Sequence, residues 1–250
     1  MRCTFIGVGS AFDETQTNTS LFIEAGGNSL LLDCGFNAAH NFVKLAENPH
    51  KLDSVWISHF HGDHFFGIPF LLGYLASVGR VDELAICGPH GIQEKVCLLV
   101  NLAYPNLLSR LPFKIVFYVF SEHDNQIVAG FDLSTCIIDH SEYALAVRVQ
   151  SEGRSLFYSG DGKLVESCMS LAQHADFAVL EAYKFKDSIK GHSSVISCLK
   201  FVDVAKISRV ALVHLEPFMR TCKLAEVAEA AKLFTSFKVI LPEENQYVDI

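Results

Sequence analysis

The sequence predicts an α/β protein built as a four-layer αβ/βα sandwich, in which two mixed β-sheets pack face to face and helices cover both outer surfaces. Half of the 250 residues are hydrophobic and only 19% are charged, which is typical of a compact globular chain. Both ends of the chain alternate strand-like and helix-like patterns around a strand-rich middle. No Pro-, Gly- or Ser-rich linker interrupts the chain, so we expect residues 1–250 to form a single domain.

The first part of the chain begins with strands and then alternates strands with helices. Helices are predicted at 38–47, about 63–78 and about 90–102. Short runs of branched and apolar residues predict strands at 2–8, 19–25, 28–33, 54–57 and 84–88. The second and third of these strands are joined by Gly26-Gly27-Asn28, which is typical of a tight hairpin turn.

The middle of the chain is rich in branched and aromatic residues, which favour strands. The expected strands cover 115–120, 133–138, 144–149 and 155–158, with a hairpin turn at Glu152-Gly153. Toward the end of the chain, predicted helices and strands alternate again. The expected elements are helices at 164–173, 193–205 and 223–234 and strands at 177–181, 209–214 and 237–240.

Composition narrows the classes of function. The eight cysteines are scattered without a CxxC pair, a pattern that favours reduced, buried thiols and a cytoplasmic protein over a disulfide framework. No apolar run is long enough to cross a bilayer, and the start of the chain lacks a signal-peptide pattern. The net charge of −8 disfavours non-specific attraction to nucleic acid.

The segment Ser58-His59-Phe60-His61-Gly62-Asp63-His64 concentrates metal-binding side chains after the predicted strand 54–57. Alternate residues of an extended backbone point to the same side, so His59 and His61 should face one another. Gly62 then permits a turn that brings up Asp63 and His64. Imidazole and carboxylate groups together suit zinc and related divalent ions. The segment therefore predicts a metal site rather than a chance surface cluster.

Four further candidate residues follow other apolar strands. Each has an ordinary structural role as an alternative, such as turn former, helix cap or buried histidine. Their shared placement at strand ends, where open α/β folds put their chemistry, favours a common site. They are His140 after strand 133–138, Asp161 in the turn Ser159-Gly160-Asp161-Gly162, His214 at the end of strand 209–214, and Asp33 at the end of strand 28–33.

The order of these residues along the whole chain resembles the metallo-β-lactamase superfamily of hydrolases. This resemblance implies two divalent metal ions, zinc first with Mn or Fe as alternatives. One ion would be held by His59, His61 and His140, and the other by Asp63, His64 and His214, with Asp161 between them. Asp33 would accept a hydrogen bond from a ligating histidine and fix its ring. Two such ions lower the pKa of a bridging water, which attacks as hydroxide, and stabilise the leaving group.

Three more features resemble the phosphodiesterase branch, which includes ribonuclease Z and cyclic phosphodiesterases. They are the turn Gly191-His192-Ser193-Ser194, the strand end Leu180-Glu181-Ala182, and the glycine turn Gly7-Val8-Gly9-Ser10. We expect His192 to protonate the leaving alkoxide as a general acid and Glu181 to orient it, while Asp63 serves both as ligand and as catalytic residue. The plainer alternatives are that His192 flanks a helix capped by Ser193 and that Glu181 is an ordinary strand-end carboxylate.

The spacing of the motifs bears on the substrate. The tRNA-processing enzymes that this chain resembles usually carry a long basic arm between the positions of His140 and Asp161. Here the two residues are close in sequence, with room for a hairpin only. Together with the negative net charge, this disfavours RNA and favours a small, cyclic or nucleotide-like phosphodiester. A tRNA endonuclease lacking the arm remains an alternative.

Two further classes stay open. An ester, thioester or lactone hydrolase would share the metal ligands, and the apolar segment 65–72 beside them could line an acyl site instead of a buried helix face. A binding module with vestigial metals would bind ions without turnover. Proteins of the resembled branch are often dimeric, so a homodimer is an expected state, and no membrane partner is expected.

Overall fold

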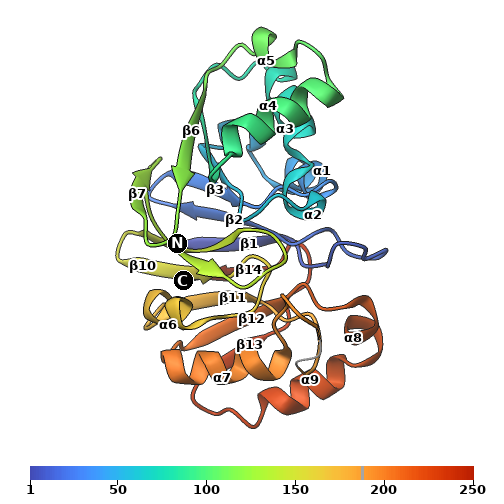
Figure 1. Ribbon diagram of the computed structural model, residues 1–250, viewed down its shortest axis with the longest axis vertical. Coiled ribbons are helices and arrows are strands. Elements are labelled where there is room, and N and C mark those ends of the chain that lie inside the picture. Colours follow the sequence, from blue (N-terminus) through green and yellow to red (C-terminus); the bar gives the residue numbers. More distant parts are fainter. Residues whose placement is uncertain (187–188) are drawn as a thin grey trace.

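The computed structural model describes residues 1–186 and 189–250 and contains two β-sheets in its centre (Figure 1). The strands of the first sheet are β1 (Arg2–Gly7), β2 (Ser20–Ala25), β3 (Asn28–Leu32), β4 (Ser54–Trp56), β5 (Leu84–Pro89), β6 (Ile115–Phe120) and β14 (Tyr247–Asp249). Those of the second are β7 (Asn125–Val128), β8 (Phe131–Ile138), β9 (Ala144–Ser151), β10 (Arg154–Tyr158), β11 (Phe177–Glu181), β12 (Arg209–Val213) and β13 (Lys238–Ile240).

Both sheets are mixed. The spatial orders are β14-β1-β2-β3-β4-β5-β6 and β13-β12-β11-β10-β9-β8-β7. Strands β3 to β6 are parallel in the first sheet, and β10 to β13 are parallel in the second, while the other neighbours are antiparallel. The carboxyl ends of parallel strands share an edge, which is where loops can gather chemically active side chains.

Helices cover the outer face of each sheet (Figure 1). On the first sheet lie α1 (Ala38–Leu45), α3 (Ile68–Ser77) and α4 (Ile92–Ala103); on the second lie α6 (Glu166–Ala172), α7 (Val195–Ala205) and α9 (Leu224–Ala231). Shorter helices are α2 (Gly62–Phe65), α5 (Leu107–Arg110), α8 (Pro217–Cys222) and a 3₁₀ turn at Pro49–Lys51. The predicted four-layer sandwich is confirmed.

A continuous apolar layer joins the inner faces of the two sheets. Phe5 and Ile23 from the first sheet pack with Leu145, Val147 and Tyr158 from the second, and all five are fully buried. Each such side chain contributes about 1.5–3 kcal/mol on burial, so the layer holds the two sheets in a fixed relation. Loops from both sheets can therefore build one rigid site at their shared edge.

The hairpins follow the predicted turn chemistry. Strands β9 and β10 are joined at Glu152-Gly153, and both residues adopt positive φ values of 52° and 73°. Two consecutive positive φ values match the right-handed twist of the paired strands, which is why glycine is favoured there. The short connection places Asp161 close behind the hairpin, with no inserted arm.

The helix predicted at about 63–78 is wrong as a single element. It is divided into α2 and α3, because the backbone N–H of Gly67 donates to the carbonyl of Cys34, 2.8 Å away, instead of continuing the helix. A Cβ at Gly67 would lie 2.2 Å from the carbonyl oxygen of Gly35, so only glycine fits. Pro69 is the second residue of α3 and lies in its first turn, where the helix needs no backbone N–H.

The remaining differences concern short elements. The sequence analysis did not predict α5, α8, β7 or β14, each of six residues or fewer. The last of these strands is stabilised by pairing with β1, where Arg2 lies opposite Asp249 and donates to its carboxylate at 2.9 Å. Within residues 1–186 and 189–250, no helix has the length and apolar character needed to cross a membrane.

Candidate metal centre

The ten residues singled out in the sequence meet at one edge of the sandwich. Asp33 follows β3, His59 and His61 follow β4, and Asp63 and His64 lie in α2. From the second sheet come His140 after β8, Asp161 after β10, Glu181 at the end of β11, His192 before α7, and His214 after β12. Asp33 and His214 both have a φ near +60°, an uncommon conformation for non-glycine residues that turns them sharply at the strand ends.

Three histidines form the first cluster. His59, His61 and His140 each present one ring nitrogen, and these nitrogens lie within 4.8 Å of one another. The ring centroids are 4.7–4.9 Å apart, and the rings are nearly perpendicular. Nε2 of His140 is 3.1 Å from Nδ1 of His61. Three imidazoles converging in this way can supply three nitrogen ligands to one ion.

The hydrogen bonds behind this cluster fix the proton positions on two of its rings. The hydroxyl of Ser58 donates to Asp33 Oδ2 at 2.8 Å, so it can only accept from His59 Nδ1, 3.0 Å away. His59 therefore carries its proton on Nδ1 and has a free lone pair on Nε2. Nδ1 of His140 donates to the carbonyl of Gly191 at 2.7 Å, which leaves its Nε2 free in the same way.

The second cluster combines two carboxylates with two histidines. Nε2 of His64 lies 3.1 Å from Asp63 Oδ2 and 3.3 Å from Asp161 Oδ2. Nε2 of His214 lies 3.3 Å and 3.1 Å from the same two oxygens. All four residues are buried, and their ligand atoms lie within 4.8 Å of one another. This donor set suits a second divalent ion.

The carboxylate of Asp33 accepts hydrogen bonds from groups that orient histidines of both clusters. Its Oδ1 accepts from the backbone N–H of Ser58 at 2.7 Å. Its Oδ2 accepts from the Ser58 hydroxyl, from Tyr158 at 2.7 Å and from His64 Nδ1 at 2.7 Å. Asp33 is fully buried, so these donors replace the water that its charge would otherwise need. The ring of His64 is thereby held with Nε2 facing the cluster.

The electrostatics of the clusters call for positive charge. Burial disfavours a charged His64, yet the carboxylates of Asp161, Asp63 and Asp33 raise the pKa of His64 well above its ordinary value. Burial opposes the charge of Asp161 as well, but His214 and His64 hold the pKa of Asp161 well below its usual range. By contrast, burial lowers the pKa of His59, so this ring stays neutral.

The residues present fit metal ions by a direct structural criterion. Among the described residues, His59 Nε2, His64 Nε2, Asp161 Oδ1 and His214 Nδ1 are buried without a hydrogen-bond partner. An unpartnered buried polar atom costs about 1–3 kcal/mol, so several in one place indicate a missing binding partner. Two of these atoms, His59 Nε2 and His64 Nε2, are ring nitrogens that face the clusters. A divalent cation satisfies such atoms and the carboxylates together.

His192 and Glu181 form a pair beside the second cluster, and their ligand atoms lie within 4.8 Å of one ring nitrogen of His214. Nδ1 of His192 lies 2.7 Å from Glu181 Oε1, and Glu181 Oε2 accepts from the backbone N–H of Ser193 at 2.9 Å. The hydrogen bond with Glu181 raises the pKa of His192 above its ordinary value. Burial raises the pKa of Glu181. The Tyr183 ring lies 5.0 Å from the His192 ring and restricts its orientation.

A cavity of about 500 Å³ opens over the second cluster. Its polar floor includes Asp63, Asp161 and His214, and His192 stands in its wall. Among the described residues, His192 Nε2 makes no hydrogen bond, so this nitrogen can face a ligand. The cavity falls within the size range of small-molecule sites.

Sequence reasoning missed three groups that support the site. Ser58 precedes the histidine motif but was given no role, and Tyr158 was read as an apolar strand residue. The third is the carbonyl of Gly191, which orients His140. The one available signal was a hydroxyl residue directly before His59, since Tyr158 reaches Asp33 only through the packing of the two sheets.

The fold is shared with solved structures. The chain superimposes on the metallo-β-lactamase fold protein YhfI from Bacillus subtilis with a TM-score of 0.82 and 21% identity, covering 99% of this chain and 98% of that one. It matches the short form of human tRNase Z with a TM-score of 0.81 and 21% identity, covering 100% of this chain and 99% of that one. The chain therefore has the metallo-β-lactamase fold, as predicted.

Comparison of the sequence with known protein families identifies the family of the chain. Residues 1–239 match the model of one family, described as Anti-Pycsar protein Apyc1, and the chain belongs to that family. Among curated relatives, ribonuclease Z of Methanosarcina acetivorans is 37% identical over 108 residues, which is 43% of this chain and 35% of that protein. The match thus spans about a third of that relative. The predicted resemblance to the ribonuclease Z-like, phosphodiesterase branch is confirmed by these relatives.

Proposed function

We propose that the protein is a binuclear metal-dependent phosphodiesterase that cleaves a small, nucleotide-like or cyclic phosphodiester. The observation that carries the proposal is the His192–Glu181 pair, joined at 2.7 Å, standing in the wall of a cavity whose floor is the second ligand cluster. A metal centre alone is common to many hydrolases. A non-ligand imidazole held by a carboxylate beside it adds the proton donor that a poor alkoxide leaving group needs.

The proposed ligands follow the two clusters. His59, His61 and His140 would hold one ion, and Asp63, His64 and His214 the other. Asp161 would bridge them, since one of its oxygens lies in the second cluster while its charge also acts on His59 and His140. Zinc is the first choice, and Mn or Fe suits the same donors. When bound, two such ions activate water and neutralise the phosphate oxygens.

The chain's own groups would handle the leaving group. Glu181 accepts the hydrogen bond of His192 Nδ1 and so directs Nε2 into the cavity. As the P–O bond breaks, the proton on His192 Nε2 moves to the departing alkoxide oxygen, and the imidazole is left neutral with its proton on Nδ1. Asp63, buried on the floor, keeps a negative charge because His64 and His214 hold its pKa well below the usual range, although burial opposes that charge.

The test compares leaving groups. A 4-nitrophenyl phosphodiester releases a stable phenolate that needs no proton, whereas a cyclic nucleotide releases an alkoxide. His192→Ala should lower kcat on the cyclic nucleotide by about 10²–10⁴-fold and on the nitrophenyl ester far less. The measurement is steady-state turnover by zinc- and manganese-loaded protein. Equal losses on both substrates would contradict the general-acid role, and absence of wild-type turnover on either would contradict the phosphodiesterase.

A small substrate is favoured over RNA. The connection between His140 and Asp161 consists of β9, β10 and their tight turn, which leaves no room for a long arm that could hold a folded RNA. The net charge of −8 adds to this. A tRNA 3′-processing endonuclease without the long arm is the alternative that the named relatives support, and cleavage of a precursor tRNA by wild-type protein would favour it.

Ester, thioester and lactone hydrolysis form the second alternative. The alternative of an acyl wall at 65–72 is not favoured, because Phe65, Ile68, Leu71 and Leu72 are buried in the core between the helices and the first sheet. They pack against the first sheet and do not line the cavity over the metal ligands. Turnover of a nitrophenyl acetate in preference to the phosphodiester would overturn this choice.

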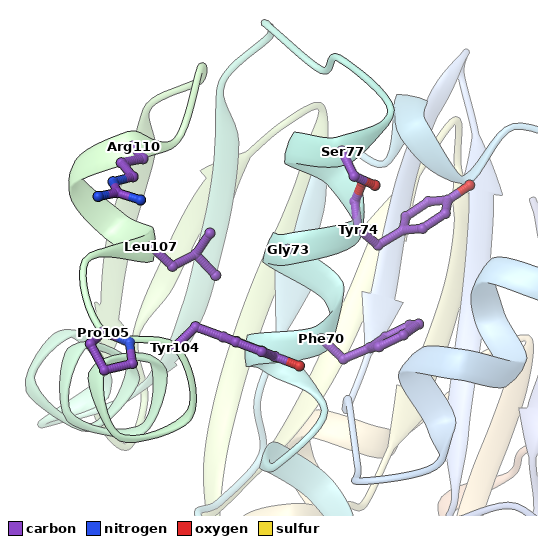
Figure 2. Close-up of a pocket in the computed structure, with 8 residues that line it drawn as sticks. All are labelled: Phe70, Gly73, Tyr74, Ser77, Tyr104, Pro105, Leu107 and Arg110. Atoms are coloured by element: carbon purple, nitrogen blue, oxygen red, sulfur yellow. The ribbon is translucent and has the colours of Figure 1, made fainter.

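We also propose a homodimer formed through the face of α3, α4 and α5. This face exposes Leu98 and Leu102 by 71% and 80%, and a groove of about 500 Å³ lies beside it. Figure 2 shows Tyr104 and Leu107 reaching toward helix α3, which carries Phe70 and Tyr74. Contiguous exposed apolar groups of this kind are typical of interaction surfaces.

The dimer is tested by light scattering during gel filtration. Leu102→Glu should convert a dimer into a monomer, because a buried, unpaired carboxylate opposes association. Leu233→Glu, on an equally exposed leucine after α9, is the matched control and should leave the mass unchanged. A monomeric wild-type protein would contradict the proposal.

Two expectations complete the proposed function. One domain over residues 1–250 is supported by the central apolar layer, to which both sheets contribute. A cytoplasmic protein is supported by its cysteines, six of which are buried thiols in apolar surroundings. Limited proteolysis tests the first expectation, since a single domain should resist cleavage between β6 and β7.

A further inference from the structure

We propose that Phe12 is the specificity-determining residue for a nucleobase: its ring stacks on the base of a nucleotide whose phosphodiester lies over the metal ligands. The inference rests on the proposed function and assigns one residue to the base end of its substrate. It starts from the uneven lining of the cavity over the second cluster. The floor is ionic, with Asp63 and Asp161, whereas Phe12 and Ala11 line the mouth and carry no polar side chain.

Phe12 is exposed to an unusual degree for its position. Its side chain is 92% exposed, although it belongs to a cavity wall. Ile189 and Pro217 line the same cavity, so the aromatic ring is part of an apolar rim and not an isolated surface residue. A phenylalanine at the mouth of an ionic cavity gains free energy only when a ligand covers it.

The loop that carries Phe12 is held in place by its own hydrogen bonds. Oδ1 of Asp13 accepts from the backbone N–H and hydroxyl of Thr15 at 2.9 Å and from the N–H of Gln16 at 3.0 Å. The side-chain amide of Asn18 donates to the carbonyls of Ser10 and Ala11, on the other side of Phe12. The ring is therefore displayed from an ordered turn, which lowers the entropy that binding would cost.

The base of this loop is tied to the metal ligands. The backbone N–H of His214 donates to the carbonyl of Val8 at 2.9 Å, and the N–H of Gly9 donates to Thr17 at 2.8 Å. Phe12 thus keeps a fixed relation to His214 on the cavity floor. A ligand with an anionic group on the floor and a flat ring at the mouth uses both ends of the cavity. A cyclic nucleotide is a phosphodiester of this form.

The first experiment measures binding by calorimetry with zinc-loaded protein, using a nucleoside 5′-monophosphate and ribose 5-phosphate as probes. The two probes share the sugar and phosphate and differ in the base. Wild type should bind the nucleotide about tenfold more tightly, the change that one aromatic–base stack produces. Phe12→Ala should abolish this preference, and Phe12→Tyr should retain it. Equal affinities in wild type, or a preference that survives Phe12→Ala, would overturn the proposal.

The second experiment reads the contact directly. Phe12→Trp places an exposed indole at the mouth, whereas the chain's single natural tryptophan, Trp56, is fully buried. Indole fluorescence should be quenched by the nucleotide and not by ribose 5-phosphate. Leu233→Trp, at an 81% exposed position after α9, is the matched control and should not respond. An unquenched Phe12→Trp under saturating nucleotide would contradict the stack.

Kinetics separate this inference from the proposed function. With 3′,5′-cyclic nucleotides, Phe12→Ala should raise KM about tenfold while kcat stays within about twofold, since the ring does not touch the reacting atoms. Wild-type turnover with an unchanged KM in Phe12→Ala would refute the base contact alone. If the proposed function were wrong, the wild-type protein would show no turnover. The preference for the nucleotide over ribose 5-phosphate in the binding experiment would still test the role of Phe12.

Discussion

The two sides of the site's histidine rings differ in how well their polar atoms are satisfied. On the side facing Asp33, Nδ1 of His64 and Nδ1 of His59 both have hydrogen-bond partners at 3.0 Å or less. On the opposite side, which faces the two ligand clusters, Nε2 of each ring is buried without a hydrogen-bond partner among the described residues. The fold therefore completes the back of the site and leaves its front to ligands. The difference indicates metal binding more specifically than the presence of histidines does.

The largest effect is expected from a substitution on the side of the site that faces the ligand clusters. Asp161→Ala removes the carboxylate shared by His64 and His214, whose Nε2 atoms lie 3.3 and 3.1 Å from it. We expect the second ion to be lost and phosphodiester turnover to fall by more than about 100-fold, beyond the loss typical of a residue behind the ligands. Elemental analysis and kinetics on the same sample measure both effects.

The control for this variant is Asp82→Ala, an exposed aspartate before β5. It should bind the same amount of metal as wild type. Full occupancy of both ions in Asp161→Ala would show that the proposed bridging position is incorrect.

An intermediate effect is expected from a substitution of Asp33, which lies behind the histidine rings. Asp33→Asn replaces an acceptor of four hydrogen bonds with an amide whose NH₂ faces donors such as Tyr158 and Ser58. Metal affinity should fall by about 10–100-fold because the ring of His64 is no longer held. The free energy of unfolding should fall by about 2–3 kcal/mol. Competition with a chelating dye measures the first effect and urea denaturation the second. An unchanged metal affinity would mean that Asp33 does not position the ring of His64.

The smallest effect is expected from Tyr158→Phe. This change removes one of four donors to Asp33 and keeps the ring that packs between the sheets. The free energy of unfolding should fall by about 1–1.5 kcal/mol, with both ions retained. Tyr143→Phe, on an exposed tyrosine, should change it by less than about 0.5 kcal/mol. If the two variants were equally stable in thermal and urea denaturation, the contact with Asp33 would have no net value.

The sequence predicted the front of the site better than the back. Asp161 and His214 could be placed at one edge because each follows an apolar strand, and the ends of neighbouring strands lie together. Tyr158 could not be assigned in the same way, because its hydroxyl meets Asp33 across the two packed sheets, 125 residues away in sequence. Such a contact depends on register and packing, which local patterns do not encode.

The same limit applies to the fold. Strand and helix order followed from hydrophobic patterns, and the two-sheet arrangement followed from their alternation. The break between α2 and α3 did not, because it depends on a close approach of Gly67 to Gly35 from another segment. Likewise β14 is a three-residue strand that pairs with β1, at the opposite end of the chain. The proposed role of Phe12 could not be predicted from the sequence either, because it depends on the position of the residue in the lining of the cavity.

The most direct test of this account is the number of metal ions held by the wild-type protein after loading with zinc and dialysis, measured by elemental analysis. Two clusters of unpartnered ligand atoms predict about two ions per chain. They also predict a higher melting temperature than that of the chelator-treated protein, because bound ions stabilise the folded state. A folded protein that retains no stoichiometric metal, with a melting temperature unaffected by chelator, would contradict it.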